Sequence, residues 1–247
     1  MQDRYAGDMG DFGKLGLLKH LILEGFHVGV NWYKTAPPKS ERNKSGAFIQ
    51  EDGKHKIKSE YFSCDPALAE RLLCISQDAN RSIAMIQNAV LLDETMVDYY
   101  DASISVEQRA AWHELALQKL ENCDLIFLDP DNGLLVKSVG KKSVKSVKYV
   151  FEEELDDYLR SGRSVVLYSH RQRKPEEKYF AEIQSRFESR DALKGKKVFA
   201  ITFPKGTVRD YFLIAANEDH TSKMERAITK MEQSLWGKLK LCRISII

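Results

Sequence analysis

The chain has 247 residues, of which 43% are hydrophobic, so it can form a substantial core and cannot be wholly disordered. Lysine and arginine number 38 against 36 aspartates and glutamates, so the net charge of +2 does not by itself indicate a nucleic-acid binder. No apolar run approaches the roughly 20 residues that cross a bilayer, and the first residues lack the apolar centre of a signal peptide. We therefore expect a cytoplasmic protein that makes no membrane contact.

The first half of the chain is predicted to be mainly helical. Hydrophobic residues at helical spacing predict a helix from Gly10 to Gly25, and a strand is predicted at 26–35. Residues 36–60 form a polar, turn-rich excursion of the kind that is functional or disordered in compact domains. Residues 65–122 are predicted to be mostly helical, with Asp65-Pro66 as the start signal.

From Asp124 onward, predicted strands alternate with predicted helices. The strands lie at 125–128, 164–168, 198–203, 211–216 and 239–247, and the helices lie at 152–160, 175–188 and 221–235. This alternation predicts one α/β domain, a three-layer sandwich with a mostly parallel, Rossmann-like sheet and an antiparallel hairpin at one edge. In such sheets ligands bind where loops leave the carboxyl ends of the strands.

The strongest local signal is the run Asp129-Pro130-Asp131-Asn132-Gly133, which directly follows the apolar strand at 125–128. Two carboxylates and an amide at a strand end are typical of a site, so Asp129, Asp131 and Asn132 are candidate catalytic residues. The alternative is that these side chains only cap a turn.

A second polar loop follows the strand at 164–168. His170 is a candidate catalytic acid or base, and Arg171 and Arg173 are candidate phosphate ligands. If this strand and the strand at 125–128 are neighbours, His170 and the two aspartates can reach one pocket. The alternative is a solvated, charged loop.

The glycine-rich N-terminal segment leads into the first predicted helix, where backbone N–H groups could hold a ligand. Its candidate substrate-binding residues are Tyr5, Asp8, Asp11, Phe12 and Lys14. No Walker A sequence is present, and the aspartates suit a base amine, a sugar hydroxyl or a water better than a phosphate. The alternative is helix capping and tight packing.

Basic residues gather on the predicted loops and favour a nucleic-acid partner, DNA rather than RNA. They are Lys137, Lys141, Lys142, Lys145 and Lys148 after the Asp129 loop, and Lys205 and Arg209 at the hairpin tip. The alternative is a solvated face. The cysteines at 64, 74, 123 and 242 share no metal-binding spacing, so we interpret them as reduced thiols, and we expect no metal and no cofactor. The oligomeric state stays open.

Two families resemble parts of the chain. Asp129-Pro-Asp-Asn resembles the D-P-P-Y strand end of adenine-N6 methyltransferases. Residues 6–20 are similar to the A-G-N-x-A-D-x-x-K-H start of ribosomal-RNA adenine methyltransferases. The 198–216 hairpin resembles the hairpin that closes the sheet of adenine-N6 methyltransferases. That resemblance implies methyl transfer from S-adenosylmethionine. Residues 127–134 and Ser169-His170 resemble the uracil-DNA glycosylase superfamily, where one strand end positions a water and another supplies a histidine near the leaving base.

These features together favour a DNA glycosylase-like hydrolase without a cofactor, with a role in defence against foreign DNA. A flipped, modified base would stack on Tyr5, Phe12 or Trp32. Asp129 or Asp131 would orient a water or stabilise an oxocarbenium-like sugar, Asn132 would recognise the base edge, and His170 would protonate the leaving base.

Three alternatives remain open. They are a diverged S-adenosylmethionine-dependent methyltransferase, a non-catalytic nucleic-acid-binding module, and a nuclease whose Mg²⁺ would be held by Asp8, Asp11, Asp129 and Asp131.

Overall fold

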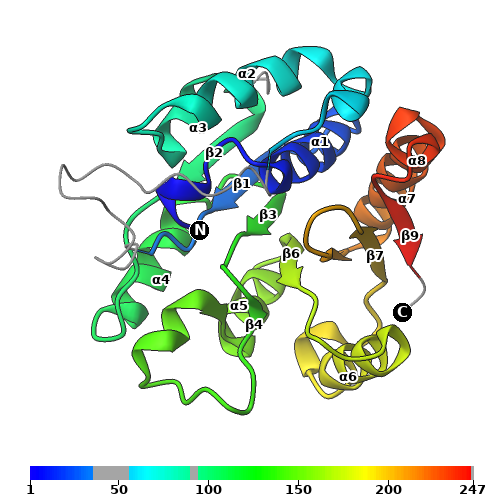
Figure 1. Ribbon diagram of the computed structural model, residues 1–247. Coiled ribbons are helices and arrows are strands. Elements are labelled where there is room, and N and C mark those ends of the chain that lie inside the picture. Colours follow the sequence, from blue (N-terminus) through cyan, green and yellow to red (C-terminus); the bar gives the residue numbers. More distant parts are fainter. Residues whose placement is uncertain (36–55, 90–93, 246–247) are drawn as a thin grey trace.

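A computed structural model describes residues 1–35, 56–89 and 94–245, so most of the polar excursion predicted at 36–60 lies outside the described residues. A seven-stranded sheet with the order β2-β1-β3-β6-β8-β7-β9 forms the centre (Figure 1). Its strands are β1 (Val28–Asn31), β2 (Val97–Tyr100), β3 (Leu125–Leu128), β6 (Ser164–His170), β7 (Val198–Phe203), β8 (Arg209–Ile214) and β9 (Arg243–Ser245).

The sheet is parallel in one half and antiparallel in the other. Strands β2, β1, β3 and β6 run parallel, with Leu125 paired with Ser164, so the strands on which the predicted site depends are neighbours. The predicted hairpin forms as β7 and β8, where β8 also pairs with β6, and β9 adds an outermost antiparallel strand. The mostly parallel α/β sandwich with an antiparallel side is therefore confirmed.

Helices cover both faces of the sheet, which makes three layers (Figure 1). Successive strand residues point to opposite faces, so Leu125 and Phe127 enter one core whereas Ile126 and Leu128 enter the other. The first core is covered by α1 (Met9–Leu23), α2 (Pro66–Gln77), α3 (Ile83–Ala89), α7 (Glu218–Gln233) and α8 (Leu235–Lys238). The second is covered by α4 (Arg109–Lys119), α5 (Glu152–Arg160) and α6 (Glu176–Glu188).

Helix α1 carries the glycine-rich segment. Asp8 caps it by accepting a hydrogen bond from the Asp11 amide, as its position predicts. A Cβ at Gly13 would lie 2.7 Å from the Phe203 ring and one at Gly16 would lie 2.5 Å from Trp236, so part of the glycine content serves close packing.

Phe12 belongs to the same packed face of α1. It is fully buried, and its ring centroid lies 4.6 Å from that of Trp236. Phe12 is therefore a core residue and not the substrate-stacking residue that the sequence predicts. Trp32, the other predicted stacking residue on the sheet side, is also fully buried.

Smaller elements depart from the sequence prediction. Strand β2 lies within the mostly helical segment 65–122; its four residues are too few for a clear alternation, and it lies at the edge of the sheet. A separate two-stranded sheet pairs β4 (Gly133–Leu134) with β5 (Tyr149–Val150). Within the described residues, every helix is too short or too polar to span a membrane.

Candidate functional site

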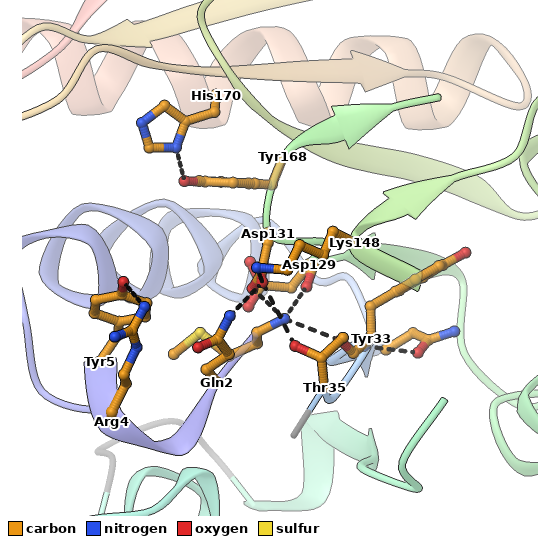
Figure 2. A network of polar contacts seen from close by, with 12 residues as sticks. Gln2, Arg4, Tyr5, Tyr33, Thr35, Asp129, Asp131, Lys148, Tyr168 and His170 are labelled. Atoms are coloured by element: carbon orange, nitrogen blue, oxygen red, sulfur yellow. Dashed lines mark hydrogen bonds and ion pairs between the residues drawn. The ribbon is translucent and has the colours of Figure 1, made fainter. Parts of the chain in front are cut away.

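A pocket lies at the carboxyl ends of β3 and β6, and residues of the N-terminal segment and of the start of β8 also line it. Figure 2 shows several of its side chains. The cavity volume of the pocket is about 220 Å³. Predicted site residues that line it are Tyr5, Asp8, Asp11, Lys14, Asp129, Asp131, Asn132, Lys148, His170 and Arg209. The structure thus places the two strand-end loops and the N-terminal segment around one pocket, an arrangement that the sequence alone could not establish.

Lys14 connects the N-terminal helix to the strand-end loop. Its Nζ lies 2.7 Å from Asp129 Oδ2 and 2.9 Å from Asp11 Oδ1, and all three side chains are almost fully buried. Burial of the Lys14 ammonium acts to lower its pKa, but the nearby carboxylates of Asp11 and Asp129 have the larger effect. The pKa of Lys14 is therefore raised above its ordinary value. Lys14 is therefore a fixed buried cation.

Asp131 is held by a different set of donors. Its carboxylate lies 3.0 Å from the Met1 amino group, accepts a 2.7 Å hydrogen bond from Gln2 Nε2, and lies 3.5 Å from Lys148 Nζ (Figure 2). Thr35 Oγ1 approaches the same carboxylate at 3.5 Å. These contacts keep the group ionised in a largely buried position.

The two carboxylates on this loop have opposite pKa displacements. Burial, only partly opposed by Lys14, raises the pKa of Asp129. Burial also acts to raise the pKa of Asp131, but the Met1 amino group, Gln2 and Lys148 outweigh it and lower that pKa. Asp129 nevertheless lies 2.7 Å from the Lys14 ammonium, so it is the carboxylate partner in a buried ion pair, whereas Asp131 faces the pocket as a second ionised carboxylate.

Gly133 allows the two strand-end loops to pack against each other. Its φ of +105° favours glycine, and a Cβ there would lie 2.4 Å from Ser169 Oγ. Beside it, the Asn132 carbonyl accepts a 3.3 Å hydrogen bond from the His170 amide, and the Asn132 amide donates to the Lys148 carbonyl. The backbone thus fixes Asn132 and His170 next to each other.

The far wall of the pocket combines aromatic and charged groups. His170 Nδ1 lies 3.1 Å from the Tyr168 hydroxyl, and burial raises the pKa of Tyr168 to about 12 (Figure 2). Arg209 is buried 3.8 Å from Asp8, whose pKa is raised mainly by burial. This wall can donate hydrogen bonds to a bound molecule.

Three predicted phosphate ligands lie away from the pocket. Arg171 points into an ion-pair network, with its Nε 2.8 Å from Asp210 Oδ2 and a further contact to Glu176. Arg173 is exposed and Lys205 is half-exposed, and neither belongs to the pocket lining. Arg171 is therefore a structural residue, because its guanidinium already has carboxylate partners, whereas substrate contacts by Arg173 and Lys205 outside the pocket stay predictions.

Other lining residues were not predicted as site residues. Met1, Gln2 and Thr207 line the pocket, and Gln2 Oε1 and Thr207 Oγ1 are buried without a hydrogen-bond partner among the described residues. A buried polar atom without a partner is costly, so these atoms indicate a ligand or water. No spacing pattern links the chain start to the hairpin tip, so the sequence carried no signal for them.

The pocket carboxylates are a poor set of magnesium ligands. Lys14 already occupies the space between Asp11 and Asp129, and the Met1 amino group occupies one side of Asp131. Within the described residues, the one group of His, Cys, Asp and Glu ligand atoms close enough to share a metal lies elsewhere. The geometry therefore disfavours the Mg²⁺-dependent nuclease.

In comparisons with known proteins, no family model matches the chain and no curated protein matches it. A functional assignment consequently depends on the geometry and chemistry of the pocket.

Proposed function

We propose that the protein hydrolyses the N-glycosidic bond of a nucleobase that has been flipped out of DNA. The observation that carries the proposal is that Asp131, Asn132 and His170 line one pocket at the carboxyl ends of the neighbouring strands β3 and β6. Glycoside hydrolysis needs one ionised carboxylate to stabilise a cationic sugar or activate water, and one protonated group to assist the leaving group.

The roles follow from the environment of each group. The ionised Asp131 stabilises the oxocarbenium-like sugar or orients the water whose oxygen bonds to C1′. As the C1′–N bond breaks, its electron pair goes to the base, which takes a proton from His170, and Asp131 accepts the proton that the attacking water loses. Asn132, which lines the pocket next to His170, bonds the base edge, and Tyr5, whose ring centroid lies 4.2 Å from the Arg4 guanidinium, lines the same pocket.

The pocket and its surroundings suit a polynucleotide. The cavity of about 220 Å³ is below the usual range for drug-sized ligands and suits a single ring system. Lys137, Lys141, Lys142 and Lys145 are exposed on the segment that leads to Lys148 at the pocket edge. They provide contacts for phosphates on either side of a flipped base. A cytoplasmic location and a role against foreign DNA stay predictions.

A second candidate is methyl transfer to a base amine. The antiparallel β7–β8 pair beside β6, and the Lys14–Asp129 contact between the two segments similar to adenine methyltransferases, favour it. S-adenosylmethionine has less support among the described residues, because the two residues that directly follow β1, Trp32 and Tyr33, are fully buried. We therefore rank methyl transfer second.

The test is base release without any cofactor. Single- and double-stranded DNA containing natural, uracil and modified bases is incubated with the protein, and small molecules and abasic sites are measured by mass spectrometry. We expect a free base and one abasic site per event. Asp131→Asn should lower the rate at least 100-fold, as expected for loss of a catalytic carboxylate. Asp191→Asn, at an exposed pair with Lys194, serves as the matched control and should leave the rate unchanged.

The possible outcomes separate the candidates. Full base release by both Asp129→Asn and Asp131→Asn would refute the assignment of the loop. A panel without released base, followed by a methylated base when S-adenosylmethionine is added, would establish the second candidate instead. Salt-sensitive binding that survives both substitutions, with no product, would indicate a binding module.

A further inference from the structure

Three metal-ligating side chains meet at the end of the sheet opposite the pocket. His27 directly precedes β1, Asp98 is the second residue of β2, and Cys123 lies two residues before β3. Their ligand atoms all lie within 4.8 Å of one another. The residues are far apart in the sequence, and only the pairing of β1 with both β2 and β3 brings them together.

The distances within this cluster suit a tetrahedral metal ion. His27 Nε2 lies 3.0 Å from Asp98 Oδ2, and Cys123 Sγ lies 3.4 Å from the same oxygen. Zinc bonds of about 2.0–2.3 Å at tetrahedral angles place neighbouring ligand atoms about 3.3–3.6 Å apart. The observed separations differ from these by a few tenths of an ångström, which side-chain rotation can absorb.

The surrounding backbone holds the ligands in place. The His27 amide donates to Asp124 Oδ2 at 3.2 Å, and the His27 carbonyl accepts from the amides of Asp124 and Leu125. Gly29 leaves room for the sulfur, because a Cβ there would lie 3.0 Å from Cys123 Sγ. A site is more precise when its ligands sit on such fixed elements.

We propose that His27, Asp98 and Cys123 bind one Zn²⁺ ion. A thiolate, an imidazole and one carboxylate form a borderline-soft ligand set that selects zinc over Mg²⁺ or Ca²⁺. The His27 and Asp98 side chains are 26% and 48% exposed, so solvent can supply a fourth ligand and the ion can enter. Cys123 is buried and would bind as the thiolate, releasing its proton to solvent.

This ion would have a structural role. It would join the amino ends of β1 and β3 to the edge strand β2, whereas the pocket lies at the carboxyl ends of β3 and β6. A metal that binds only the folded chain raises its stability by mass action, so zinc should raise the melting temperature.

The test uses the full chain freed of metal with a chelator and titrated with Co²⁺ and then Zn²⁺. We expect one Co²⁺ per chain with a thiolate-to-cobalt charge-transfer band that Zn²⁺ abolishes. Cys123→Ser should remove the band, and His27→Gln and Asp98→Asn should each weaken binding at least tenfold. Cys74→Ser removes an exposed cysteine outside the cluster and should change nothing.

Either of two results would overturn the proposal. One is the absence of a charge-transfer band in the natural chain. The other is unchanged metal binding in His27→Gln and Asp98→Asn, which alter partly exposed side chains and decide the question even if Cys123→Ser fails to fold.

Discussion

Replacement of Lys14 by methionine tests the charged centre of the pocket. The substitution keeps most of the side-chain volume and removes an ammonium that lies 2.7 Å from Asp129 and 2.9 Å from Asp11. The three side chains are 4%, 2% and 1% exposed, so two carboxylates would be left buried without their cation. Breaking a buried pair in this way costs about 3–5 kcal/mol of unfolding free energy.

A double-mutant cycle separates the ion pair from other effects. Asp129→Asn alone should cost less, about 1–3 kcal/mol, because Lys14 keeps Asp11 as its partner. Since Lys14→Met and Asp129→Asn disrupt the same contact, the double variant should be more stable than the sum of the single effects by about 0.5–3 kcal/mol.

The assay is urea unfolding at neutral pH, with Lys19→Met as the matched control. Lys19 lies on the same helix and is 2.6 Å from Asp65, but its side chain is 34% exposed, so its loss should cost about 1 kcal/mol or less. If Lys14→Met cost no more than Lys19→Met, or if the cycle were additive, the buried ion pair would not hold the pocket together as described.

Further predictions concern pH, packing and salt. The pKa of Asp131 is lowered in the folded chain, so its ionised form stabilises the fold at pH values above the ordinary pKa of 3.8. This stabilisation is lost as the pH falls below 3.8 and through the lowered pKa. Asp131→Asn should therefore make acid unfolding, followed by circular dichroism, less steep. Phe12→Ala should lower the unfolding free energy by about 3–5 kcal/mol in urea titrations, because it empties a packed core site. Gly133→Ala should cost about 1–3 kcal/mol in the same assay and reduce base release, because the strand-end loops must separate. Changing both Lys142 and Lys145 to alanine should reduce the slope of log affinity against log salt by about two, as measured by DNA binding at several salt concentrations.

The alternation of buried strands and amphipathic helices made the sheet predictable. Residues 125–128 are apolar throughout because both faces of a central parallel strand are covered, and the sequence alone shows this pattern. Once β3 and β6 are neighbours, their carboxyl ends must meet at one edge, which is why Asp129 and His170 could be assigned to one pocket.

Side-chain partners were less predictable than strand positions. An arginine in a loop can face a ligand or an internal carboxylate, and Arg171 faces Asp210, whose position depends on the strand pairing of β6 with β8. Phe12 could have faced the ligand or the core, because α1 is apolar on nearly all sides and its pattern does not distinguish them. The sequence did not predict the cluster of His27, Asp98 and Cys123, because these residues share no local spacing.

The pairing of charges in the pocket favours a neutral base inside and phosphates outside. Five cationic groups line the pocket, which are the Met1 amino group, Arg4, Lys14, Lys148 and Arg209, and they face the four carboxylates of Asp8, Asp11, Asp129 and Asp131. A phosphate-binding pocket would leave cations available for the phosphate, whereas here Lys14 is already shared between two carboxylates and the Met1 amino group is paired with Asp131. Exposed lysines such as Lys142 and Lys145 lie instead on the segment that leads to Lys148, which lines the pocket. An interior whose charges are paired with one another, next to a segment of exposed lysines, is what the proposed enzyme needs if it holds a strand by its backbone and tests one base at a time.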